Sequence, residues 1–170
     1  MAHDGSLASQ VEDWIVEQIQ ALQVGGQAAF AAEDVRAWEG TESESVRDFS
    51  EELFEAARSR IARVLFTGDR PLELEYDQIR LEPTYLILVG LKNYRPGSAR
   101  RGESTTAGEW GTNKMRDLLA QTFSLKQPDK DNGVMHTDLT HYRGATIEYH
   151  PRNTCIMRVE IVVEESPIAA

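Results

Sequence analysis

The sequence predicts one α+β domain, with a mixed, mainly antiparallel sheet and helices packed on one face of it. Segments with helical spacing precede and interrupt several strand-like segments, and short turns separate consecutive strands. Such turns favour antiparallel pairing. A chain of 170 residues, 41% of them apolar, is also long enough to form one core without disulfides or metals. We therefore expect a single domain over residues 1–170.

The N-terminal region predicts an amphipathic helix. Its apolar residues recur at helical spacing and are Leu7, Val11, Trp14, Ile15, Ile19 and Leu22. Ser9 and Glu12 have the spacing of a capping box. Gly25 and Gly26 are typical of a helix end. The whole segment therefore predicts a helix with one buried face.

A weak strand and a second helix are expected next. Phe30, Val35 and Trp38 fit a short strand. The apolar residues that then follow helical spacing are Val46, Phe49, Leu53, Phe54 and Ala57. This second helix is rich in Glu and is predicted to end near Arg58.

The middle of the chain predicts three strands. Ile61–Phe66 has the composition of a short buried strand, and Gly68-Asp69 indicates a turn after it. In Leu72–Asp77, apolar and acidic residues alternate, as in a half-buried strand. The most apolar run of the protein, Tyr85–Leu91, predicts the central strand of the sheet.

The C-terminal third predicts a helix and a strand pair. Met115, Leu118 and Leu119 indicate a third helix over Thr112–Thr122, and the last strands are expected at Leu139–Tyr149 and Thr154–Val163. Along the last strand, Met157, Val159, Ile161 and Val163 should form the buried face, with Ile156, Arg158, Glu160 and Val162 on the other. Residues 165–170 are expected to be a short tail.

Charge is distributed unevenly along the chain. The net charge is −10, with 18 acids and 7 bases up to Glu82 but 10 acids and 11 bases after it. An acidic first half does not suit nucleic-acid binding, which needs clustered Lys and Arg. It would suit a passage through which a polyanion slides without sticking, although solubility alone explains acidic helix faces and is the favoured interpretation.

The expected location is inside a cell and in solution. The single cysteine, Cys155, cannot form an internal disulfide, which fits a reducing compartment. Residues Met1–Gly5 lack the features of a signal peptide, and Tyr85–Leu91 is too short to span a bilayer. We therefore expect neither conventional secretion nor membrane insertion.

Catalytic patterns are weak. His136, Asp138 and His141 lie near one another in sequence, but a separation of five positions puts the two histidines on opposite faces of a strand. Cys155 has only His150 nearby as a base and is better explained as a small strand residue. The chain has no phosphate-binding loop, nucleophile elbow or dinucleotide motif. We expect no cofactor, no metal and no enzymatic activity.

A long exposed loop is the strongest candidate site. Residues 93–111 are rich in glycine, and a cluster of bases runs from the preceding strand into this loop. The candidate interface residues are Lys92, Arg95, Arg100, Arg101 and Trp110. The bases could contact the acidic half of an identical neighbour, and head-to-tail packing that closes gives a ring. A solvated loop is an equally good explanation of the same charges.

The order of these elements resembles the small tail-terminator proteins of Mu-like tailed phages and, more loosely, those of lambda-type tails. Two helices flank a short strand over Leu7–Arg58, and a strand opens the sheet at Arg60–Phe66. A long strand and a variable loop then lead over Tyr85–Gln121 to a glycine-preceded helix, Gly111-Thr-Asn-Lys-Met-Arg-Asp-Leu-Leu. The strand pair closes on Ile156-Met-Arg-Val-Glu-Ile-Val-Val.

This resemblance implies a tail-terminator-like fold and a structural role in the virion. Such proteins form a homohexameric ring at the head-proximal end of the tail, after assembly in the host cytoplasm. The ring caps the tail tube protein, ends tube growth and joins the head-tail connector protein, and DNA passes through its lumen without specific binding. No active-site residue carries over from the family.

Three other functions remain open. A neighbouring head-tail connector or neck protein would have the same kind of assembly role at another position. A small acidic adaptor would bind one partner as a monomer. An enzyme that uses His136, Asp138 and His141 would bind a metal and lose activity on His136→Ala.

Overall fold

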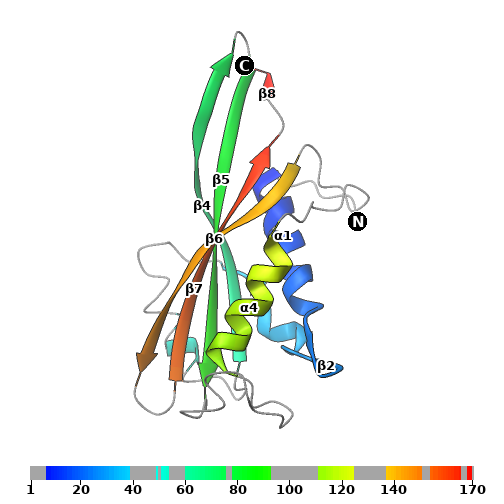
Figure 1. Cartoon of the computed structure of the whole chain (residues 1–170), viewed down its shortest axis with the longest axis vertical. Coiled ribbons are helices and arrows are strands. Elements are labelled where there is room, and N and C mark those ends of the chain that lie inside the picture. The colour runs from blue at the N-terminus through cyan, green and yellow to red at the C-terminus, as the bar shows by residue number, and fades with distance from the viewer. Residues whose placement is uncertain are drawn as a thin grey trace.

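The computed structural model describes the part of the chain that forms a main sheet, a separate two-stranded sheet and the helices against the main sheet (Figure 1). The described residues are 7–38, 49, 51–53, 60–75, 78–92, 111–124, 137–150, 154–165 and 168–169. The helical elements are α1 (Leu7–Gln20), η1 (Ala32–Asp34) and α4 (Thr112–Phe123). The strands are β1 (Gln23–Val24), β2 (Gln27–Ala28), β3 (Val35–Ala37), β4 (Arg60–Glu75), β5 (Gln78–Lys92), β6 (Thr137–His150), β7 (Thr154–Glu165) and β8 (Ile168–Ala169).

The main sheet has the strand order β3-β4-β5-β7-β6, and β8 pairs with the far end of β5. In the described part of this sheet, β3 runs parallel to β4 and the other neighbours are antiparallel. The prediction of an α+β fold with a mixed, mainly antiparallel sheet is therefore confirmed. The apolar run Tyr85–Leu91 lies in the central strand, as its composition predicts.

Two helices, α1 and α4, cover the first face of the sheet. Both lie on the same side of the strands in Figure 1. Their buried side chains meet the inward residues of β5 and β7, and the rings of Trp14 and Phe123 pack edge to face with centroids 6.0 Å apart. The buried face predicted for β7 is confirmed; it consists of Met157, Val159, Ile161 and Val163. Of the described helices, none has the length and apolar character needed to cross a bilayer.

The second face of the sheet is covered by a different helical segment. Phe49 and residues 51–53 are helical, and Phe49 and Leu53 pack on the side of β5 opposite α1 and α4. The prediction that the helices pack on one face is therefore wrong. The physical reason is that β5 is apolar on both sides: Leu86 and Leu88 point to this second face, and their burial requires a second cover.

One predicted turn is a bulge. Gly68-Asp69 does not end a strand, because β4 continues through both residues, and Gly68 pairs with Thr84. The register shifts between Phe66 and Gly68, where Gly68 has φ +123°, a conformation that glycine adopts without strain. In β6, the strand at the opposite edge of the sheet, a similar register shift occurs at Gly144 (φ +137°).

These two bulges lie at the same level of the sheet. Phe66, Tyr85, Ile161 and Tyr142 form one row across the four long strands, and each outer strand bulges immediately after its member of the row. Bulges increase the local right-handed twist. In Figure 1 the strands of the twisted sheet overlap midway along their length, and beyond that point β4 and β5 continue as a long hairpin.

The ends of the predicted elements need three further corrections. The α1 helix begins at Leu7, so Ser9 is not its cap, and Glu12 bonds elsewhere. The expected tail at 165–170 contains Glu165, which belongs to β7, and β8, which pairs with Gln78 and Ile79. Of the predicted loop 93–111, only Gly111 is described; it is buried and precedes α4.

Candidate interaction surface

Most of the sequence-predicted interface lies outside the described residues. Lys92 is the last residue of β5 and is partly exposed, at the opposite end of that strand from the hairpin turn. The others, Arg95, Arg100, Arg101 and Trp110, are not among the described residues. The structure therefore places one member of the cluster at a sheet end and leaves the grouping of all five a prediction.

The residues weighed for catalysis are separated as well. His136 lies outside the described ranges, and His141 is a partly exposed residue of β6 that pairs with Val162. Among the described residues, no three His, Cys, Asp or Glu side chains are grouped as a metal site requires. Cys155 is fully buried in the core of the first face. Burial raises the pKa of its thiol to about 12, and a backbone hydrogen bond with Leu91 opposes the rise.

A nearly buried carboxylate connects three strands on the second face. Glu82 of β5 has a side chain only 10% exposed. Its Oε1 accepts hydrogen bonds from Arg70, the register partner on β4, whose Nε lies 3.0 Å away. Its Oε2 lies 3.3 Å from a guanidinium nitrogen of Arg143, which is the extra residue of the β6 bulge. The bulge thus lets an edge-strand arginine reach across β7 to β5.

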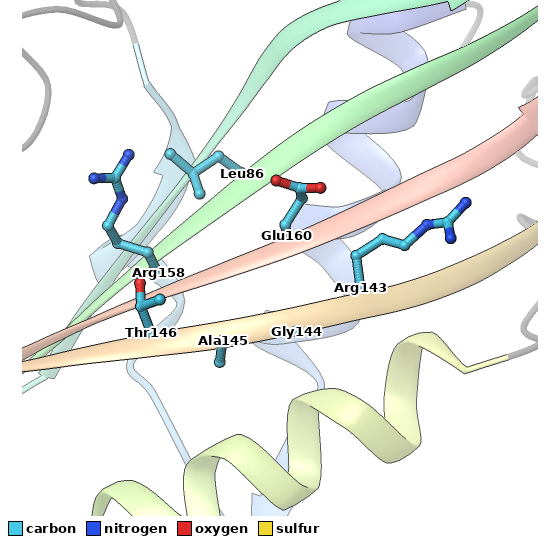
Figure 2. A pocket seen from close by; sticks show the side chains of 7 residues that line it. All are labelled: Leu86, Arg143, Gly144, Ala145, Thr146, Arg158 and Glu160. Atoms are coloured by element: carbon cyan, nitrogen blue, oxygen red, sulfur yellow. The ribbon is translucent and has the colours of Figure 1, made fainter.

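A shallow cavity of about 520 Å³ is lined in part by Arg143. Leu86 of β5 is at its base, and Arg143 and Thr146 of β6 line one side. Figure 2 shows Arg158 and Glu160 of β7 projecting into the same space, on the side of the sheet away from α4. We call this region, defined by these five residues, the open half of the second face.

Arg158 and Glu160 differ from the other charged residues there. Neither has an ion pair or a side-chain hydrogen bond within the part of the chain that the structure describes. Their strand neighbours on this face are Leu88 and Thr146 for Arg158, and Leu86 for Glu160. The open half therefore presents two opposite charges, two residues apart, without internal partners.

The other half of the second face is covered by the helical segment with Phe49 and Leu53, and a buried arginine connects this segment to the sheet. Arg63, which is 4% exposed, donates to the backbone oxygens of Asp34 and Ala62 and forms an ion pair with Glu52 of the helical segment. Glu52 also pairs with Arg36 of β3 at 2.8 Å. This network fixes the segment that carries Phe49 and Leu53 to the sheet.

A carboxylate from α1 reaches the outer edge of β4. The backbone nitrogen of Phe66 donates to Oε1 of Glu12 at 2.6 Å, just beyond the stretch of β4 that pairs with β3. Burial raises the pKa of Glu12, the hydrogen bond lowers it, and the charge of Asp13 raises it further. The side chain therefore occupies a strand edge that would otherwise be open to pairing.

Sequence reasoning located part of this surface. The alternation along β7 put Arg158 and Glu160 on the less buried face, and the structure confirms that side. Glu82 and Arg143 carried no sequence signal, since their contact depends on the strand order β5-β7-β6. In comparisons with known proteins, neither a family model nor a curated protein matches the chain.

Proposed function

We propose that the chain is a structural virion protein with a tail-terminator-like fold, which forms a homohexameric ring at the head-proximal end of a phage tail. The ring caps the tail tube protein, ends its growth and joins the tube to the head-tail connector protein. In this proposal the chain has no catalytic step and needs no cofactor.

The observation that carries the proposal is the long β4–β5 hairpin. Beyond the row that contains Tyr85, β4 and β5 stay paired to Glu75 and Gln78, and β8 is the described strand that joins them there. Figure 1 shows this arm extending past α1 and α4. A long two-stranded extension is suited to contacts with other subunits.

Charge gives independent support. The first 82 residues carry 18 acids and 7 bases, whereas the predicted interface has only bases among its charged members. Lys92 lies at the end of β5 opposite the arm. Attraction between the basic cluster of one copy and the acidic half of the next favours a head-to-tail ring, and an acidic lumen would let DNA pass without binding.

The mass of the purified protein in solution tests the ring directly. Light scattering over a range of concentrations should give a species near six subunits, or a monomer that approaches this mass as concentration rises. High salt should weaken the species if the basic cluster contributes. A strict monomer under all conditions, together with no binding to isolated tail tubes, would contradict the proposal and favour the acidic adaptor.

A charge-reversed variant identifies the surface involved. Replacing Lys92, Arg95, Arg100 and Arg101 by Glu should abolish the six-subunit species, while Lys114→Glu on the exposed side of α4 should leave it intact. Immunogold labelling of particles then separates the terminator from a neck protein. Label at the head-proximal end of tail tubes lacking heads supports the terminator, and label on tail-free heads supports the neck protein.

A further inference from the structure

The two outer edges of the main sheet differ in how they are closed. At one edge, β3 pairs with Ala62–Val64 of β4, and the carboxylate of Glu12 accepts from the amide of Phe66. Further along β4 come the bulge at Gly68 and then Pro71, two features that discourage pairing at sheet edges. The described edge of β4 is therefore poorly suited to a further strand.

The opposite edge, formed by β6, is open after its bulge. Within the described part of the chain, the backbone of residues 144–148 pairs on one side only, with β7. Figure 2 shows β6 as the outermost of the long strands. This stretch contains neither proline nor lysine, and its single charged residue is Glu148. A bare edge of this kind is a template for pairing with another strand.

Apolar side chains are also exposed along β6. The large apolar residues that are exposed in the described part of the chain, Leu139 at 38% and Tyr149 at 48%, both belong to this strand. On the first face, Ala145 and Ile147 are half-buried, whereas the residues opposite them on β7 are fully buried. The cover provided by α4 is therefore centred inward of β6. A strand added at this edge would bury apolar surface that the chain leaves open to water.

We propose that residues 144–148 form a two-fold contact, in which β6 pairs antiparallel with β6 of a second copy and Thr146 lies on the axis. The axis is perpendicular to the sheet, so the main sheet continues across both chains and each face stays on its own side. The two α4 helices lie on the same side, each inward of its own edge strand. Because the contact is edge to edge, the side chain of Thr146 remains open to solvent on the second face.

The occupant is a second copy because the stretch is complementary to its own reverse. With Thr146 opposite its equivalent, Ile147 lies opposite Ala145 and Glu148 lies opposite Gly144. A large apolar side chain thus meets a small one on the first face. Threonine pairs across antiparallel strands are favourable, and the two carboxylates stay apart. A register centred on Glu148 would instead place two like charges opposite each other.

This contact goes beyond the function proposed above. It is isologous, because the same residues of both copies meet across a two-fold axis, so it does not close a ring by itself. In a hexameric ring it would join two rings, and in a protein that forms no ring it would give a dimer. Its test is therefore independent of the ring.

Disulfide cross-linking tests both the edge and its register. In a Cys155→Ala background, Thr146→Cys should give a disulfide-linked dimer under mild oxidation, because its Cα lies about 5 Å from its equivalent. The control is Glu148→Cys, which is exposed on the same face of β6. Its Cα would lie about 13 Å from its equivalent, too far for a disulfide. Non-reducing gels over time should show cross-linking at least about tenfold faster at residue 146 than at residue 148. Equal rates would overturn the proposal.

Charges placed on the axis test the contact by association. In Thr146→Lys two ammonium groups meet, and in Thr146→Glu two carboxylates meet, so each variant should pair about tenfold more weakly in sedimentation velocity. An equal mixture of the two should regain wild-type pairing, because lysine then lies opposite glutamate. Gln121→Lys adds the same charge on an exposed site of α4 and should leave pairing unchanged. Thermal melts of all variants check that the fold is retained.

Three results of the association experiment would overturn the proposal. They are unchanged pairing in both charged variants, a mixture that associates no better than its components, and a wild-type protein that shows no doubling of mass. A six-subunit mass without doubling would overturn the two-fold contact while leaving the ring intact.

Discussion

The two faces of the sheet are covered in different ways. On the first face, α1 and α4 lie over the inward residues of β5 and β7, and the described core there includes Trp14, Tyr85 and Phe123. On the second face, one helical segment covers part of the strands, and the rest carries Arg143, Arg158 and Glu160. Both faces belong to the same four long strands, so the difference comes from alternate residues within each strand.

The first face of the sheet thus serves mainly the stability of the fold, whereas the open half of the second face is available for contacts with other molecules. The larger of the two apolar cores lies on the first face, where hydrophobic burial stabilises the fold. The charged side chains of the open half are not buried and gain no such stabilisation. A face that served only the core would carry apolar residues there under a complete cover.

The largest difference between the two faces is expected in the reactivity of a cysteine thiol placed on each. Cys155 lies in the first-face core, and burial raises the pKa of its thiol to about 12. Thr146 is exposed on the open half. With iodoacetamide at pH 8, native Cys155 should react more than about a thousandfold slower than the cysteine introduced by Thr146→Cys in a Cys155→Ala background, because only the thiolate reacts.

Denaturation provides the control for this comparison. In concentrated urea both cysteines are solvated, and their alkylation rates should become similar. Comparable rates in the native protein would mean that the first face opens as readily as the second, and the contrast between the two faces would be lost.

Truncation of neighbouring residues on β5 should give the next largest difference. Ile87 is fully buried on the first face, and Leu86, 8% exposed, lies at the base of the open half. We expect Ile87→Ala to lower the free energy of unfolding by about 3–5 kcal/mol and Leu86→Ala by about 2 kcal/mol. Urea denaturation measures both, and the two changes remove the same number of carbon atoms. Equal losses would show that the open half is as well packed as the first face.

An added methyl group tests the covered part of the second face. In Gly90→Ala the new Cβ would meet Leu53 at 2.8 Å and Phe49 at 3.1 Å, so the helical segment must move. The expected loss of stability is about 1–3 kcal/mol by thermal denaturation. In a Leu53→Ala background the same substitution should cost much less, since the methyl group then occupies vacated space. A cost that does not depend on residue 53 would place the strain elsewhere.

Much of the fold could be predicted because its signals are local. The helical spacing of α1 and the apolar run in β5 depend only on neighbouring residues, and both elements form as expected. Gly68-Asp69 shows the limit of such signals. Glycine followed by an acidic residue is typical of turns, but it also fits a bulge. Here a bulge forms because Gly68 pairs with Thr84 on the next strand, and such pairing cannot be read from neighbouring residues.

The candidate surface was predictable only where alternation along one strand sufficed. Arg158 and Glu160 follow from the pattern of β7. The contact between Glu82 and Arg143 could not be predicted, because it crosses an intervening strand and depends on the extra residue in β6. The helical cover of the second face was missed for a related reason: the sequence of β5 shows that both faces are apolar but does not say which segment covers each.

The smallest expected effect concerns the pH dependence of stability at the β4 edge. Burial raises the pKa of Glu12 above its ordinary value, so the folded state holds this proton more tightly than the unfolded state. The contribution of Glu12 to stability is therefore complete below its unfolded pKa and is lost as pH rises through its folded pKa. Glu12→Gln removes the titration but keeps an oxygen that accepts from the Phe66 amide.

We therefore expect Glu12→Gln to match the wild type at pH 4 and to exceed it at pH 7 by less than about 1 kcal/mol in urea denaturation. Glu12→Ala leaves the Phe66 amide without this acceptor and should lose about 1 kcal/mol at both pH values. If Glu12→Gln is instead less stable at pH 7, the ionised carboxylate stabilises the fold, and its hydrogen bond to the strand edge outweighs the cost of burying the charge. The first face would then depend on a charge at its margin, as the second face does.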